Sequence, residues 1–160
     1  MLILLGGCAS HINKSAVQLP AAKQYAIGSF WNYTETPMAG LSVASIVEGV
    51  LAKKSITLYS MVEGSEADSA EITKTQQLNQ QIQIAQSKKL NYLITGEVQE
   101  WRYKTGIDAE PVVSFTLKVI DLQTNQVVFS GLGAKSGLGH QSIGTVAQEI
   151  AEALIPQFVP

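Results

Sequence analysis

Cysteine and histidine are the side chains with the most versatile chemistry, and this sequence holds few of them. Cys8 is the one cysteine, and His11 and His140 are the two histidines. A single thiol closes no internal disulfide and does not make up a metal site. With one histidine in the expected domain and no G-x-S-x-G motif, no nucleophile–base pair can be assembled. The sequence therefore predicts a binding or assembly protein without cofactor or metal, and not an enzyme.

The residues before Cys8 suggest a different use for its thiol. Leu5-Gly6-Gly7-Cys8 resembles the lipobox of bacterial lipoproteins, in which the cysteine is diacylated and becomes the mature N-terminus. Small residues also precede the cleavage point of export signals. Ala9 follows, and in lipoproteins generally the absence of aspartate there favours the outer membrane. We expect Cys8 to be lipidated; the alternative is an ordinary buried cysteine near a frayed terminus.

This expectation sets the domain organisation. Residues 1–7 are interpreted as the remnant of a signal peptide that starts upstream, because no basic residue precedes Cys8 and the apolar core is short. Residues 8–22 are small and polar and are expected to form a lipidated tether. Residues 23–160 suit one globular domain. No apolar stretch reaches about 18 residues, so the expected anchor is lipid.

The composition of the chain limits the kinds of partner that it can bind. The chain has a net charge of −2, with 46% hydrophobic and 15% charged residues, and no basic run. Such a chain should fold, and it lacks the positive surface that nucleic acid requires. Nucleic acid is therefore not an expected partner.

Hydrophobic periodicity predicts a mixed sheet with helices mainly on one face, an α/β (α+β) fold. Val113, Phe115, Leu117 and Val119 alternate with Ser114, Thr116 and Lys118, as in a sheet with one face on the core. The expected order is β-α-β-α-β-β-β-α. The strands are expected at 23–33, 55–62, 92–104, 111–121 and 126–131, and the helices at 41–54, 72–90 and 142–155.

Three other features remain open to two interpretations each. Six glutamines between residues 76 and 86 form either a solvated helix face or a face that meets a neighbouring subunit. Asp108 and Glu110 lie in the turn before Pro111, where carboxylates are commonly just solvated. The glycine-rich loop expected at 131–141 matches no phosphate-binding motif, and its Leu138 either faces lipid or folds back onto the last helix.

The order and spacing of several short motifs resemble the PelC family, outer-membrane lipoproteins of Pel polysaccharide export. The motifs are T-E-T-P-x-A-G, E-W-R-Y-K, D-x-E-P, V-I-D and S-G-x-G, and they extend over roughly residues 25–155. The resemblance implies a fold related to CsgG and the N-terminal domain of TolB. It also implies a lipid-anchored homo-oligomeric ring on the periplasmic face of the outer membrane. That ring would lie beneath a PelB-like β-barrel and guide a cationic polysaccharide toward it.

The same resemblance implies roles for individual residues. An aspartate is typical of the turn before Pro111, so Asp108, with Glu110 beside it, is expected to guide the polysaccharide. In a ring, one carboxylate per subunit becomes a circle of negative charge that concentrates a cationic polymer. The family loop tends to carry a tryptophan between its glycines that dips into the membrane. Here Leu138 takes that place and is expected to contact the membrane.

Two alternatives stay open. Lipoprotein activators of penicillin-binding proteins share this fold and act as monomers on a long tether that reaches a cell-wall synthase. The expected tether of about 14 residues spans at most roughly 45–50 Å, which favours a domain held at the membrane. A structural lipoprotein without an export role is the second alternative.

Overall fold

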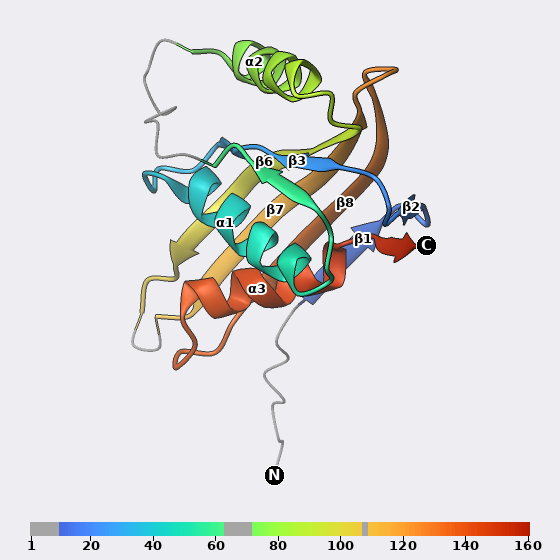
Figure 1. Ribbon diagram of the computed structural model, residues 1–160. Helices are drawn as coiled ribbons and strands as arrows, with labels where there is room; N and C mark the ends of the chain where they lie inside the picture. The colour runs from blue at the N-terminus through green and yellow to red at the C-terminus, as the bar shows by residue number, and fades with distance from the viewer. Residues whose placement is uncertain (1–9, 63–71, 107–108) are drawn as a thin grey trace.

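The computed structural model describes residues 10–62, 72–106 and 109–160 (Figure 1). A seven-stranded mixed sheet has the order β1-β8-β7-β6-β3-β5, with β4 also pairing with β6, and β2 and β9 form a separate two-stranded sheet. The strands are β1 Ser10–Lys14, β2 Gln18–Pro20, β3 Tyr25–Ile27, β4 Trp31–Asn32, β5 Leu58–Ser60, β6 Tyr92–Tyr103, β7 Pro111–Asp121, β8 Gln126–Ser136 and β9 Gln157–Val159. The helices are α1 Ala39–Ala52, α2 Lys74–Ser87 and α3 Ile143–Leu154.

The antiparallel strands β6, β7 and β8 form the central meander. The alternation predicted for 111–121 is confirmed, because Val113, Phe115 and Val119 are fully buried in the main core. Helices α1 and α3 pack side by side over this face of the sheet (Figure 1).

Helix α2 covers part of the opposite face. Leu93 and Ile120 pack with Ala85 of α2 in a second, smaller core, whereas Ile94 belongs to the main core. Adjacent residues of a strand point to opposite faces, so α2 lies across the sheet from α1 and α3. The predicted α+β class, the mixed sheet and the placement of most helices on one face are therefore confirmed.

The N-terminal segment differs from the tether expected over 8–22. Residues 10–14 form the edge strand β1, which pairs antiparallel with β8 from Ser10 opposite Lys135 to Lys14 opposite Gly131. Lys14 Nζ also donates to the Ala153 carbonyl at 2.7 Å, at the end of α3, where helix carbonyls lack helical partners. Because every residue of β1 is exposed, the strand has no apolar alternation from which to be predicted.

Strand β8 is longer than expected, and the loop predicted at 131–141 begins only at Gly137. Gly131 and Gly133 lie within the strand, on the face covered by α3. A side chain at Gly133 would overlap Ile150 and press on Leu154. Glycine here allows the close approach of a helix and does not form a loop.

Gly96 of β6 offers a test of the packing. A methyl group at this position would overlap the Thr116 carbonyl oxygen and the Phe30 ring. We expect Gly96→Ala to lower the free energy of unfolding by about 3 kcal/mol in urea denaturation, as overpacking does. Gly49→Ala, on the open face of α1, has no atom within 4 Å of the new methyl. It should instead raise the free energy by about 0.5–1 kcal/mol; equal effects would contradict this packing.

Candidate functional site

One end of the sheet gathers the segments that carry the predicted site residues. Strand β1 begins there opposite Lys135, and β6 ends there opposite Pro111. The Gly137 N–H donates to the Pro111 carbonyl at 2.8 Å, so the loop after β8 lies against the start of β7. The structure thus brings the β6–β7 connection, the Leu138 loop and the beginning of the described chain to the same end.

Cys8 lies outside the described residues, but the covalent chain limits its position. It precedes Ser10 by two residues, which span about 7 Å when extended. An acyl group on Cys8 would therefore attach close to this end of the sheet. We refer to it below as the anchor end, formed by Ser10, by Lys104 and Glu110 on either side of the β6–β7 turn, and by the loop at 137–142.

Leu138 projects from the anchor end. Its side chain is 43% exposed. The loop closes on itself, because Leu138 N–H donates to Gln141 Oε1 at 2.8 Å and Gln141 N–H donates to the Leu138 carbonyl at 2.9 Å. Tyr103, 48% exposed, accepts a hydrogen bond from the Ile143 N–H through its hydroxyl at 3.1 Å. An exposed leucine and an exposed tyrosine therefore stand at the same end.

The acidic turn is described only in part. Asp108 lies outside the described residues. The Glu110 carboxylate forms an ion pair with Lys104 at 2.7 Å, and both side chains are partly exposed. The Glu110 charge is therefore balanced locally by Lys104.

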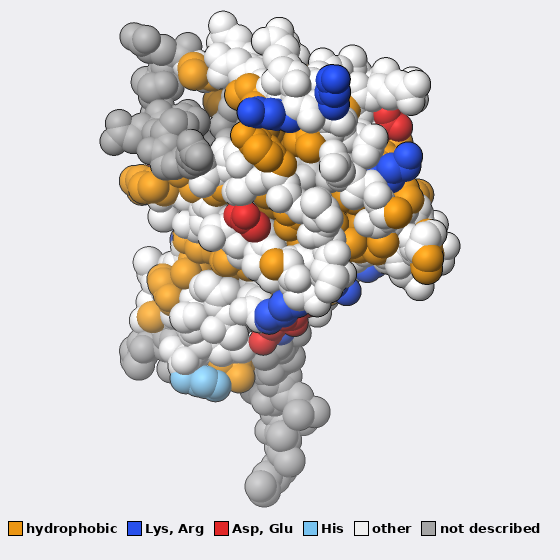
Figure 2. Space-filling view, viewed as in Figure 1, with side chains coloured by type: hydrophobic (Ala, Val, Ile, Leu, Met, Phe, Trp, Pro, Cys, Tyr) orange, Lys and Arg blue, Asp and Glu red, His pale blue; other side chains and the backbone are white. Residues whose placement is uncertain are grey.

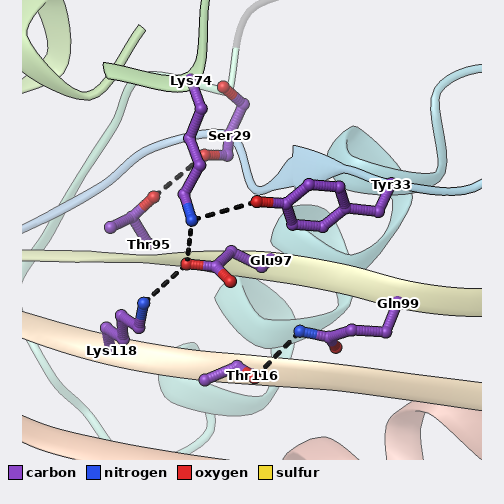
Figure 3. A network of polar contacts seen from close by, with 8 residues as sticks. All are labelled: Ser29, Tyr33, Lys74, Thr95, Glu97, Gln99, Thr116 and Lys118. Atoms are coloured by element: carbon purple, nitrogen blue, oxygen red, sulfur yellow. Dashed lines mark hydrogen bonds and ion pairs between the residues drawn. The ribbon is translucent and has the colours of Figure 1, made fainter.

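A second polar cluster lies on the other side of the sheet from α1 and α3. Glu97 Oε1 accepts from Lys74 Nζ at 2.7 Å and from Lys118 Nζ at 2.6 Å. Lys74 Nζ also donates to the Tyr33 hydroxyl at 3.2 Å (Figure 3). This network joins α2, β6, β7 and the segment after β4.

The elements fix these side chains in place. Trp31 of β4 lies opposite Glu97 in the strand register. Glu97 in turn lies opposite Thr116 of β7, two residues before Lys118 on the same strand. Thr73 caps α2 through a reciprocal capping box with Gln76, which orients the first turn that carries Lys74. The alternation of 111–121 places Lys118 on this face, but only the strand register shows that Glu97 is its partner.

The ion pairs shift the titration of two of these groups. Burial acts to raise the pKa of Glu97, but hydrogen bonds from Lys118 and Lys74 outweigh it and hold the pKa below its ordinary value. The hydrogen bond to Glu97 raises the pKa of Lys74. Two lysines surround one glutamate, so the formal charges of the cluster sum to one excess positive charge.

Two of the six glutamines of α2 face this cluster. Gln77 and Gln81 are buried, and each donates from Nε2 to the Ser29 hydroxyl at 2.9 Å. The solvated-face interpretation is therefore wrong for these two residues. They recur at helical spacing with Lys74 and Leu78, which also line the gap between α2 and the sheet.

Within the described residues, no group of three or more histidine, cysteine, aspartate or glutamate side chains is arranged to hold a metal ion. No helix of the described part of the chain is long and apolar enough to cross a bilayer.

Known family models and curated proteins offer no match to the chain. Solved structures do: a PelC dodecamer from Paraburkholderia phytofirmans is 30% identical over 90% of this chain and 93% of that chain, with a TM-score of 0.74. A point variant of that dodecamer is 31% identical over 89% and 93%, with a TM-score of 0.72. The chain belongs to the PelC family. The resemblance inferred from the sequence motifs is therefore confirmed.

More distant structures share the fold with this PelC-family chain. A Neisseria meningitidis lipoprotein is 10% identical over 82% of this chain and 94% of that chain, with a TM-score of 0.59. The C-terminal domain of Escherichia coli LpoB is 19% identical over 74% and 86%, with a TM-score of 0.51. At these identities the likeness concerns the fold alone.

The Glu97 cluster predicts a pH dependence of stability. Because the pKa of Glu97 lies below its unfolded value of 4.5, the carboxylate stabilises the fold above that pH. This contribution is lost as the pH falls through the folded pKa. We expect Glu97→Gln to cost about 1–2 kcal/mol of unfolding free energy at neutral pH. The difference from wild type should shrink between about pH 5 and pH 3.

Urea denaturation across this pH range measures the effect. Glu100→Gln is the matched control, because the Glu100–Arg102 pair is more exposed and should contribute little. A Glu97→Gln difference of the same size at both ends of the pH range would contradict the ion-pair account.

Proposed function

We propose that this chain is a lipid-anchored component of an outer-membrane Pel polysaccharide export apparatus and assembles as a ring-shaped homo-oligomer. The observation that carries the proposal is its 30–31% identity to dodecameric PelC over about nine-tenths of both chains. In this role the chain is not an enzyme. It forms a passage for a polymer that other proteins make.

The surface over α1 supports assembly from several copies. From Ala39 to Ala52 the helix carries one charged residue, Glu48. Charged side chains are accordingly sparse over α1 in the space-filling view (Figure 2). The outer face of α1, where Ser45 and Gly49 are exposed, therefore carries little charge that a neighbouring copy in a ring would have to desolvate.

The anchor end supports attachment to the outer membrane at the periplasmic face. Ser10 already belongs to the sheet, so lipidation of Cys8 would hold the domain directly against the bilayer. Leu138 at the same end would contact the membrane. Asp108, with a smaller contribution from the paired Glu110, would guide the cationic polysaccharide toward a PelB-like barrel.

No specific observation favours the penicillin-binding-protein activator. Its support is a shared fold with LpoB at 18–19% identity. An activator needs a long tether between its lipid anchor and its domain, whereas here only one residue separates Cys8 from β1.

Cys8→Ser tests the anchored export role. In the organism that encodes the chain, deletion of its gene should stop secretion of the Pel polymer. The wild-type gene behind a complete export signal should restore secretion, incorporate labelled palmitate and place the protein in the outer-membrane fraction. Cys8→Ser at equal abundance should do none of these. Full restoration by the serine variant would refute the anchor, and continued secretion after deletion would refute the export role.

Leu138→Ser tests the membrane contact. Measured in the Cys8→Ser background, binding to phospholipid vesicles should weaken about tenfold, since burial of one leucine contributes about 1.5–3 kcal/mol. The melting temperature should stay close to that of the parent, because the side chain is already exposed. Leu132→Ser is the matched control: it is 39% exposed, on the sheet face away from α3, and should bind vesicles normally. Equal losses from both variants would contradict a specific role for Leu138.

A further inference from the structure

A hollow opens between α2 and the outer face of the sheet, beside Glu97. Its volume is about 110 Å³, and we call it the Glu97 hollow. Its lining residues combine an apolar wall with polar and charged side chains: Trp31, Leu78, Ile120 and Val127 form the wall, and Lys74, Gln77, Gln81, Thr95, Glu97 and Lys118 supply the polar groups. Pockets with an apolar lining and a few convergent polar groups are the usual form of a ligand site.

The apolar wall is accessible from solvent. Val127 is 54% exposed, and Trp31 is half-buried. Trp31 packs edge-on against Tyr33, with ring centroids 6.4 Å apart. Tyr33 thus supports Trp31 from the side, and Trp31 offers the hollow an aromatic side chain against which a partly apolar molecule can pack.

The polar groups beside this wall offer both donors and an acceptor. Both lysines donate to Glu97 Oε1. Within the described residues Glu97 Oε2 accepts no hydrogen bond, and it stands clear of the dashed contacts in Figure 3. Lys118 Nζ has three N–H donors and directs one to Glu97. A free carboxylate oxygen next to an ammonium group suits hydroxyl groups, which donate to the one and accept from the other.

The excess positive charge selects among ligands. With Lys74 and Lys118 around a single Glu97, the cluster repels an ammonium group and tolerates a neutral one. The hollow is also smaller than the roughly 300–1,000 Å³ of pockets that enclose a drug-sized ligand. It therefore fits one ring, or one substituent, of a longer molecule that continues into solvent.

We propose that the Glu97 hollow binds an uncharged sugar unit, an N-acetylated amino sugar, of the polysaccharide that passes the protein. The ring would rest on Trp31, its hydroxyl groups would bond to Glu97 and Lys118, and its acetyl methyl would contact Leu78 and Val127. This inference rests on the proposed export function and assigns the neutral units of the polymer a place distinct from the acidic turn.

Calorimetry and NMR titration of the full chain test the site with two probes, N-acetylated chitotetraose and its fully deacetylated form. The acetylated probe should bind, and the deacetylated, cationic probe should bind at least about tenfold more weakly. Trp31→Ala should weaken binding of the acetylated probe about tenfold or more. Tyr59→Ala, which removes an aromatic ring of 40% exposure on β5, away from the hollow, should leave it unchanged.

Several results would overturn the proposal: no binding of either probe, preference for the cationic probe, or equal effects of Trp31→Ala and Tyr59→Ala. Glu97→Gln gives a second route that does not depend on the aromatic wall, and it should also weaken binding of the acetylated probe. Oligomer mass and polymer secretion are measured for the wild type in parallel. If the wild type forms the oligomer and secretes the polymer but binds neither sugar probe, the proposed sugar site is refuted and the export role stands.

Discussion

The alternation of side chains along the β6–β7–β8 ladder is the constraint on which the rest of the structure depends. Phe115 and Leu117 must face α1 and α3, and this requirement fixes the register of β7 against both neighbours. A slip of one residue would turn Lys118 into the core and Phe115 into solvent. Helix α3 can pack closely on this ladder because Gly133 leaves room for Ile150.

The same register creates the chemistry of the opposite face. Once the apolar residues of β6 and β7 point inward, Glu97 and Lys118 must point outward and lie diagonally across two strands. Parallel pairing of β4 then sets Trp31 beside Glu97. The polar cluster and the aromatic wall of the Glu97 hollow therefore follow from the apolar pattern of the core, and the central strands of the sheet hold them in place.

The parts of the fold that could be predicted are those in which one face of an element is buried. Strand β7 was predicted at its observed bounds, and α3 within a residue, because their periodicity is strong. Strand β1 could not be predicted, because both faces of this edge strand are exposed and its sequence therefore shows no alternation of apolar and polar residues. Gly131 and Gly133 were expected in a loop because their role, closeness to a helix, is invisible without α3. The burial of Gln77 against Ser29 and the pairing of Glu97 with Lys118 likewise depend on contacts between distant segments.

The edge strand β1 has a mechanical consequence. If the chain is held at Cys8 while a polymer drags on the domain, the tension enters the fold at Ser10 and runs along the length of β1. Backbone hydrogen bonds to β8 lie across that direction, so all of them share the load at once and do not open one after another. At the far end of the strand, the Lys14 side chain is fastened to the last carbonyls of α3. An anchor at Cys8 would thus load the domain in shear, the geometry in which a short strand resists force best.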